Sequence, residues 1–249
     1  MRRRLADSRS AACRAIDEGR VRVTGVAEPK AATLVAPSAA VTITDPSPKW
    51  AGRGGHKLDG ALNEFAVDVT GRIALDVGAS TGGFTDVLLA HGASTVTAID
   101  VGYGQLVWRL RQDPRVTVID RTNFRHVDVA EIGAPFDLVV VDVSFISVAM
   151  LAERLAEAGH AGTDYIVLVK PQFEVGKGRV GKGGIVSEPS LHRSAIEKVA
   201  TALEATGLGV VHLTRSPIEG AKGNREFFLH LRPGPAADLS AKLVEVTAP

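Results

Sequence analysis

Short runs of apolar, often β-branched residues recur along most of the chain, and they alternate with segments whose apolar positions have helical spacing. Continuous runs of this kind are typical of strands that are buried on both faces of a sheet. They predict seven strands, near residues 73–77, 95–100, 116–120, 138–142, 165–170, 209–214 and 226–231, with helices near 83–91, 105–111, 148–158 and 190–206. The alternation predicts an α/β fold with a doubly wound, Rossmann-like sheet of seven strands.

The beginning of the chain has a different pattern, which predicts a small separate module. Apolar positions in residues 8–18 are spaced as in a helix that ends at Gly19, and residues 21–24 and 41–43 alternate at the period of a strand. A stretch with two prolines and three glycines follows and predicts a linker. The expected organisation is a module at 1–44, a linker at 45–55 and a larger domain at 56–249.

Charge is distributed unevenly between these parts. The net charge is only +1, but residues 1–60 carry eleven Lys and Arg against six Asp and Glu, and the remainder carries eighteen against twenty-two. A basic arm on a mildly acidic body is typical of a nucleic-acid-binding segment attached to an enzyme, although a solvated charged surface gives the same counts. The candidate RNA contacts are Arg4, Arg9, Arg14, Arg20 and Arg22.

The composition excludes several classes of protein. The single cysteine, Cys13, rules out an intramolecular disulfide and a zinc site built from cysteines. No apolar run approaches the roughly 18 residues that a membrane span requires. We therefore expect a cytoplasmic protein that binds no metal and does not associate stably with a membrane.

A glycine-rich segment follows the first strand expected in the larger domain. It runs Asp76-Val77-Gly78-Ala79-Ser80-Thr81-Gly82-Gly83-Phe84 and leads into an expected helix. Glycines at such a turn let the backbone approach a ligand closely, and the helix N-terminus offers unpaired N–H groups to an anionic group. About twenty residues later the next strand ends at Asp100, where a carboxylate can accept both ribose hydroxyls of an adenosine.

Two other nucleotide-binding patterns share parts of this sequence. A nicotinamide dinucleotide site requires Gly-x-Gly-x-x-Gly, whereas residues 79–81 are Ala-Ser-Thr, so S-adenosylmethionine is the favoured cofactor. Residues 176–182 match the start of a phosphate-binding P-loop, but Gly183 stands where Ser or Thr must reach magnesium. We interpret that segment as a basic loop, either solvated or in contact with RNA phosphate. The expected cofactor-binding residues are Asp76, Gly78, Ala79, Ser80, Thr81, Gly82, Gly83, Phe84, Asp100, Val101, Asn123 and Asp142.

Four charged residues are the candidates for catalysis. Asp142 and Lys170 each end an apolar strand, Glu226 opens the last expected strand, and Lys57 follows a glycine-rich stretch just inside the larger domain. Any one of them alone is explained equally well as the point where a strand reaches water. The presence of all four together is more specific for a catalytic site.

With their neighbours, these four residues resemble the Lys-Asp-Lys-Glu tetrad of the FtsJ-like ribose 2′-O-methyltransferases. More closely, nearly the whole chain resembles the TlyA (hemolysin A) family of ribosomal RNA methyltransferases. The segments that carry the resemblance are 53–58 (RGGHKL), 76–85 (DVGASTGGFT), 100–106 (DVGYGQL), 142–147 (DVSFIS), 170–174 (KPQFE) and 223–228 (GNREFF).

The resemblance implies a fold, a reaction and partners. It implies methylation of cytidine riboses in the RNA of the small, and often the large, ribosomal subunit, with S-adenosylmethionine as cofactor and no DNA partner. Residues 5–44 would be an α-L RNA-binding module, a fold shared with a ribosomal protein. Met1 falls inside the helix with which family members begin, so either the start of the sequence is mis-assigned or the module lacks its first turns. An RNA-binding protein without catalysis and a membrane-active hemolysin remain alternatives, and the oligomeric state stays open.

The chemistry of ribose explains the four charged residues. A 2′-hydroxyl is a very weak acid, so its attack on a methyl group needs deprotonation or stabilisation of the developing alkoxide. We assign Lys170 as the general base and Lys57 as its electrostatic partner, with Asp142 and Glu226 orienting the lysines and the hydroxyl. Methylation of a base is disfavoured because no Asn/Asp-Pro-Pro-aromatic string is present and Cys13 is far from the cofactor segment.

Overall fold

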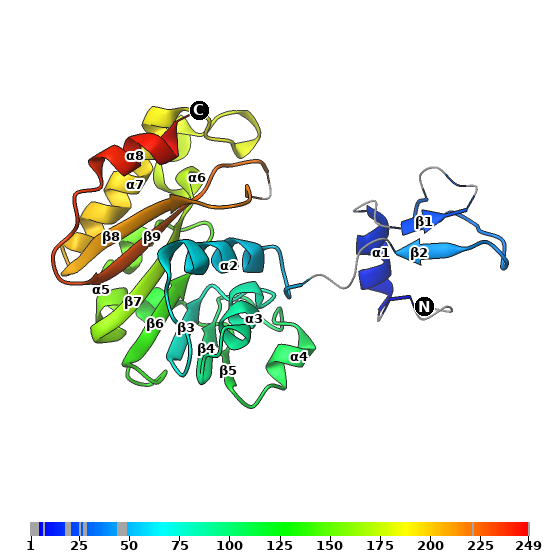
Figure 1. Ribbon diagram of the computed structural model, residues 1–249, viewed down its shortest axis with the longest axis horizontal. Helices are drawn as coiled ribbons and strands as arrows, with labels where there is room; N and C mark the ends of the chain where they lie inside the picture. The colour runs from blue at the N-terminus through cyan, green and yellow to red at the C-terminus, as the bar shows by residue number, and fades with distance from the viewer. Residues whose placement is uncertain are drawn as a thin grey trace. The chain divides into compact units, whose positions relative to one another are not determined.

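The computed structural model describes residues 5–6, 8–17, 21–24, 26, 29–43, 49–220 and 222–248. The chain divides into two compact units, Met1–Lys49 and Trp50–Pro249, which are treated separately below (Figure 1). Residues 50–55, which the sequence placed in the linker, are part of the larger unit. Trp50 is buried in its core, and a helix already begins at Gly54.

Within its described residues, the smaller unit contains one helix and a two-stranded antiparallel sheet, as its sequence pattern predicts. Helix α1 (Arg9–Asp17) precedes strands β1 (Val21–Val23) and β2 (Val41–Ile43). Strand β1 alternates as expected, because Val23 is buried and Arg22, between the two valines, is exposed.

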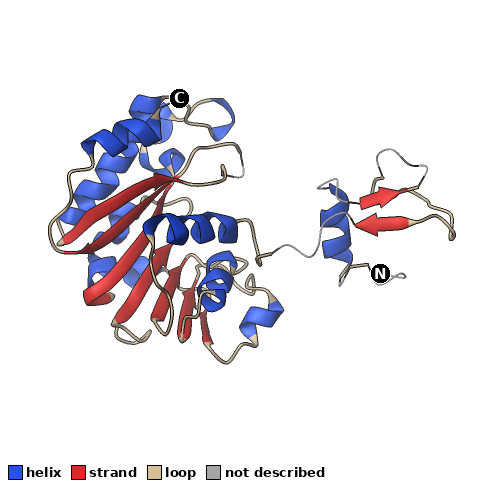
Figure 2. Cartoon of the chain, viewed as in Figure 1, coloured by secondary structure: helices blue, strands red, loops and turns tan. Residues whose placement is uncertain are grey.

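The larger unit is built on a seven-stranded sheet, which confirms the predicted α/β class (Figure 2). Its strand order is β5-β4-β3-β6-β7-β9-β8, and β9 is antiparallel to both of its neighbours while the other pairs are parallel. The antiparallel strand could not be read from the apolar pattern. The strands are β3 (Ile73–Val77), β4 (Thr95–Ile99), β5 (Val116–Ile119), β6 (Phe136–Val141), β7 (Gly159–Val169), β8 (Leu208–Arg215) and β9 (Phe227–Pro233).

Helices cover both faces of this sheet (Figures 1 and 2). Helices α2 and α3 pack on one face, and α5, α7 and α8 pack on the other. The α-helices are α2 (Gly54–Phe65), α3 (Gly83–Ala90), α4 (Trp108–Arg111), α5 (Ala152–Glu157), α6 (Pro171–Glu174), α7 (Pro189–Glu204) and α8 (Ser240–Thr247). Short 3-10 turns are η1 (Phe124–His126), η2 (Val148–Leu151), η3 (Lys177–Arg179) and η4 (Lys182–Gly184).

Three of these helices, α2, the single-turn α6 and α8, were not predicted from the sequence. Helix α2 begins with two glycines, which the composition placed in a linker. The reason for a glycine here is steric: a Cβ on Gly55 would lie 2.4 Å from the Cβ of Trp50. Buried Leu58, Leu62 and Phe65 then follow at helical spacing and pack this helix on the sheet.

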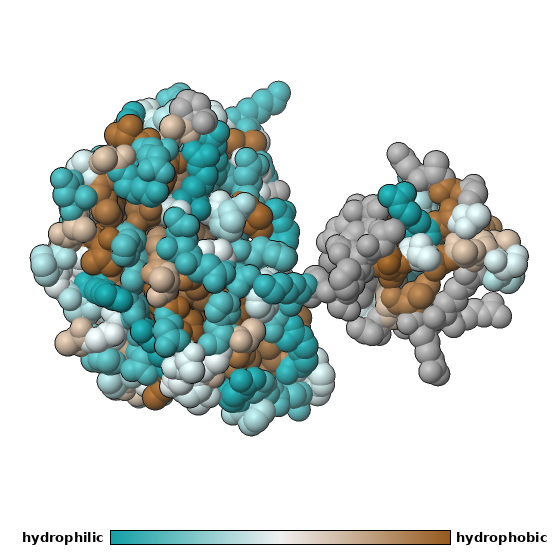
Figure 3. Space-filling model, viewed as in Figure 1, coloured by the Kyte–Doolittle hydropathy of each residue, from teal (hydrophilic) through white to brown (hydrophobic). Residues whose placement is uncertain are grey.

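The strands alternate between the two cores, which explains their continuous apolar sequences. In β6, Leu138 and Val140 join the core beneath α2 and α3, whereas Val139 and Val141 join the core beneath α5 and α7. On the face of the larger unit seen in Figure 3, apolar residues are visible between polar ones. Within the described residues, no helix has the length and apolar character needed to cross a membrane.

Candidate functional site

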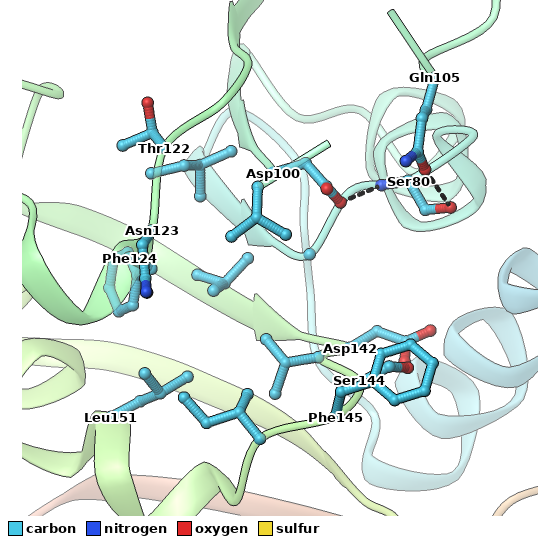
Figure 4. Close-up of a pocket in the computed structure, with 16 residues that line it drawn as sticks. Ser80, Asp100, Gln105, Thr122, Asn123, Phe124, Asp142, Ser144, Phe145 and Leu151 are labelled. Atoms are coloured by element: carbon cyan, nitrogen blue, oxygen red, sulfur yellow. Dashed lines mark hydrogen bonds between the residues drawn. The ribbon is translucent and has the colours of Figure 1, made fainter. Parts of the chain in front are cut away.

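Four neighbouring parallel strands end at one edge of the sheet, and the candidate residues follow directly after them. Strand β3 leads into Gly78, β4 into Asp100, β6 into Asp142 and β7 into Lys170. Ligands of doubly wound sheets bind at this edge. A cavity of about 310 Å³ lies here, a size suited to a small-molecule cofactor (Figure 4).

The glycine-rich segment forms a tight turn against the end of β6. Gly78 has φ +90°, and a Cβ there would lie 2.5 Å from the carbonyl oxygen of Asp142. Ser80 is also in the left-handed region, at φ +47°, and its N–H donates to Asp100 Oδ2 at 2.8 Å (Figure 4). Its hydroxyl bonds to Gln105. The turn is therefore fixed from the neighbouring strand, which holds the cavity wall in place.

Asp100 has the geometry expected of an acceptor for a ribose. Its Oδ1 accepts the N–H of Gly102 at 2.7 Å, and its Oδ2 accepts that of Ser80. Each carboxylate oxygen has a second lone pair, so two acceptor positions remain for vicinal hydroxyls. Exposed Val101 lies beside it on the cavity wall, where an adenine ring can pack.

Asn123 lines the same cavity from the segment after β5. Its carboxamide oxygen accepts the N–H of Arg125 at 3.1 Å and caps the turn η1. Among the described residues nothing accepts from its amide nitrogen, which can therefore donate to a nitrogen of a purine. The cavity, Asp100 and Asn123 together fit the adenosine part of S-adenosylmethionine.

A second, smaller cavity of about 90 Å³ adjoins this one and shares three of its lining residues, Gly78, Ser80 and Asp142. The predicted Ala79, Thr81, Gly83 and Phe84 line it, together with Gly54. Of the twelve predicted cofactor residues, only Asp76 and Gly82 line neither cavity.

These two residues support the turn from behind. Gly82 caps helix α3 with φ +96°, and a Cβ on it would collide with Leu110. Asp76 is fully buried and accepts the hydroxyl hydrogen bond of Thr85 at 2.6 Å, while among the described residues its other oxygen has no partner. Burial raises the pKa of Asp76 to about 7, and the nearby Asp142 adds to this shift.

The four catalytic candidates form two ion pairs, one buried and one part-buried. Lys57 Nζ, on α2, lies 2.5 Å from Glu226 Oε2, and both residues are less than one-tenth exposed. Lys170 Nζ lies 2.5 Å from Asp142 Oδ1 and donates to the hydroxyl of Ser144 at 2.8 Å. Each lysine thus faces a carboxylate, as the sequence interpretation required of Asp142 and Glu226.

Helix α2 brings the two pairs to one place. Its first residue, Gly54, would carry a Cβ only 3.5 Å from Asp142 Oδ2, and Lys57 lies one turn further along the same helix. Lys170 is held at the junction of β7 and α6, where Pro171 occupies the first helical position. Of the four residues, Asp142 lines both cavities, and Gly54 at the start of α2 lines the smaller one.

Sequence reasoning missed an aromatic residue beside these pairs. Phe145 lines the cavity (Figure 4), is 92% exposed and has φ +67°. Its ring centroid lies 5.3 Å from that of Phe173. A bulky side chain with positive φ is uncommon and often marks a functional site. Nothing in the apolar pattern could reveal either its backbone conformation or its exposure.

The remaining candidates lie elsewhere. Arg9 and Arg22 are exposed on the smaller unit, the side chain of Arg14 on α1 is not described, and Arg4 and Arg20 fall outside the described residues. Residues 176–183 follow α6 rather than joining a strand to a helix, which excludes a P-loop. Within the described residues no cluster of three or more His, Cys, Asp or Glu could hold a metal.

Comparison with known proteins agrees with this geometry. Residues 50–233 match the FtsJ-like methyltransferase family. The chain is 49% identical over 246 residues to a 16S/23S rRNA (cytidine-2′-O)-methyltransferase TlyA of Mycobacterium tuberculosis, covering 98% of this chain and 92% of that protein. It is 42% identical over 183 residues to hemolysin A of Brachyspira hyodysenteriae, covering 73% and 76% respectively.

A solved structure gives the same result for the fold. A candidate hemolysin from Streptococcus thermophilus superposes with a TM-score of 0.81 at 37% identity, over 98% of this chain and 90% of that one. The chain is therefore an S-adenosylmethionine-dependent methyltransferase of the FtsJ-like family, and within it belongs to the TlyA family.

Proposed function

We propose that this enzyme methylates the 2′-hydroxyl of cytidine riboses in the RNA of one or both ribosomal subunits. The observation that carries the proposal is the presence of two lysine–carboxylate pairs, one buried and one part-buried, beside the cofactor cavity. Relatives named as 16S/23S and 23S rRNA (cytidine-2′-O)-methyltransferases support it. The reaction would take place in the cytoplasm, with neither DNA nor a membrane as partner.

The pairs suit the proton chemistry of a ribose. S-adenosylmethionine supplies an electrophilic methyl group on a sulfonium, so the protein has to make the 2′-oxygen of the RNA nucleophilic. Lys170 would take the proton of the 2′-hydroxyl in its uncharged amine form and become the ammonium that pairs with Asp142, and Asp142 and Ser144 would hold its amino group toward the cavity. Lys57, held by Glu226, would stabilise the negative charge that develops on the oxygen.

The surroundings of Lys170 suit a nucleotide. The exposed ring of Phe145 can stack on a base, and such stacking accepts any base because each has an aromatic face. Phe173 supports that ring from behind. A base held on Phe145 would carry its ribose to the neighbouring Ser144 and Lys170, which favours a sugar rather than a base as the methyl acceptor.

The smaller unit would bind the rest of the RNA. We assign residues 1–44 as an α-L RNA-binding module and the segment after it as the connection to the enzyme domain. A helix and a two-stranded antiparallel sheet are compatible with that module, and exposed Arg9 and Arg22 could contact phosphates. The coverage of 98% of the chain by the alignment with the mycobacterial enzyme supports this assignment.

The test is transfer of a labelled methyl group from S-adenosylmethionine to ribosomal RNA or ribosomal subunits. Lys170→Met keeps most of the side-chain volume and removes the amino group, so turnover should fall by ~10²-fold or more while cofactor binding persists. Lys242→Met is a matched control, because Lys242 pairs with Glu245 on the outer side of α8. Wild-type protein that labels no ribosomal RNA, or a Lys170→Met variant with full turnover, would overturn the proposal.

A further inference from the structure

Two segments far apart in the sequence interlock beside the candidate site. One is the connection after β6, residues 142–148, and the other is residues 170–174, which contain α6. Lys170 pairs with Asp142 at the first contact, and Phe173 packs on Phe145 at the second. The third contact, made by Glu174, has no role in the proposed chemistry.

Glu174 is a buried carboxylate with three donors around it. Its side chain is 1% exposed; Oε2 accepts the hydroxyl of Ser147 at 2.5 Å, and Oε1 accepts the N–H of Val148 at 2.8 Å. Lys198, from α7, lies 3.1 Å from Oε2 and also donates to the backbone oxygen of Glu174 at 2.9 Å. A buried charge with these partners fixes the position of each of them.

These contacts hold the C-terminal end of residues 142–148 in place. Ser147 is the N-cap of η2, but its own side chain makes no capping bond, and Glu174 caps Val148 instead. Lys170 and Glu174 are four residues apart, at the two ends of α6. One therefore holds the beginning of residues 142–148 and the other holds their end, with the left-handed Phe145 between them.

We infer that Glu174 is a positioning residue for methyl transfer, which holds the end of residues 142–148 so that the ring of Phe145 stays beside Lys170. This inference rests on the proposed function. Phe145 requires such support, because a non-glycine residue with positive φ persists only where its surroundings hold it. Without Glu174, the N–H of Val148 and the hydroxyl of Ser147 lose their acceptor, and the connection can relax.

The test measures steady-state methylation of ribosomal RNA by Glu174→Ala and Glu174→Gln. Glu174→Ala should lower kcat/KM for RNA by about 10- to 100-fold, mainly through KM, because Phe145 contacts the nucleotide rather than the reacting atoms. The dissociation constant of S-adenosylmethionine should change by less than about threefold, because Asp100 and the glycine-rich turn are untouched. Glu174→Gln keeps an oxygen for Val148, so it should retain at least about a third of wild-type kcat/KM.

Two further variants separate positioning from a general loss of stability. Asp164→Asn removes an equally buried carboxylate, which lies on β7 away from the site and binds the side chains of Arg72, His230 and Arg232. This variant should keep kcat/KM within about threefold of wild type. The double variant Glu174→Ala/Phe145→Ala should be no worse than Phe145→Ala alone, because Glu174 acts through that ring. Hydrogen exchange of the Val148 amide should quicken in Glu174→Ala and not in Asp164→Asn.

Unchanged kcat/KM in Glu174→Ala would overturn the inference, as would an equal loss in Asp164→Asn or additive losses in the double variant. Wild-type protein that methylates no ribosomal RNA would instead refute the proposed function. Hydrogen exchange then decides alone: unchanged protection of Val148 in Glu174→Ala overturns the positioning role.

Discussion

Asp100 is the residue whose loss should weaken cofactor binding most selectively. Its carboxylate accepts two backbone N–H groups and still presents two acceptor positions to the cavity. Asp100→Ala removes both positions and also releases Ser80, whose left-handed turn forms the cavity wall. Asp100→Asn keeps the shape but sets an amide donor against one of the two N–H groups.

The size of the effect follows from the number of contacts. Two ribose hydroxyls lose a charged acceptor in Asp100→Ala, and water replaces part of what is lost because the cavity is open to solvent. A net cost of about 2–3 kcal/mol is expected, since each such bond is worth ~1.5–3 kcal/mol before that replacement. The dissociation constant of S-adenosylmethionine should therefore rise by about 30- to 150-fold. The dissociation constant of Asp100→Asn should lie between those of Asp100→Ala and the wild type.

Isothermal titration calorimetry with S-adenosylmethionine and its demethylated product measures this directly. Asp120→Asn is the matched control: Asp120 follows the neighbouring strand β5 and accepts from Arg111 and Gly104, but it does not line the cavity. Its affinity should stay within about threefold of wild type. At saturating cofactor, Asp100→Ala should keep most of its kcat, because Asp100 touches the adenosine rather than the reacting atoms. Equal affinities for Asp100→Ala and wild type would refute the assignment of this cavity.

Three other predictions concern the remaining charged groups. Lys57→Met and Glu226→Gln should each lower turnover by ~10²-fold, and the double variant should be little worse than either single one in a labelled-methyl assay, because the pair acts as a unit. Burial favours the neutral form of Asp76, so its contribution to stability is complete below about pH 4 and is lost as pH rises through about 7; thermal melts of Asp76→Asn should lack this decline. Neutralising Arg9 and Arg22 should reduce the salt dependence of RNA binding by about one unit of slope per lost phosphate contact, and an unchanged slope would exclude them from the interface.

The strands and the edge where they bind ligands could be predicted from the sequence. Continuous apolar runs identify strands that are buried on both faces, and a parallel sheet brings their ends together. Asp100, Asp142 and Lys170 follow directly after β4, β6 and β7 for this reason. The same logic failed for α2, because its opening glycines serve a close contact with Trp50 that no local pattern encodes.

The details of the site depend on contacts between distant segments, and these could not be predicted. The pairing of Lys57 with Glu226 spans 169 positions and depends on β9 running antiparallel to β7. The exposure of Phe145 depends on a left-handed backbone that Phe173 and the buried Glu174 support from another segment. Local propensity favours neither feature, so only the three-dimensional arrangement reveals them.

The position of the transferred methyl group tests the central claim most directly. Ribosomal RNA labelled by the purified enzyme is hydrolysed in alkali, which cannot cleave next to a blocked 2′-oxygen. If Lys170 deprotonates a ribose, the label will appear in an alkali-resistant dinucleotide, and complete digestion will give 2′-O-methylcytidine. Label in an ordinary mononucleotide with the methyl group on the base would contradict the account.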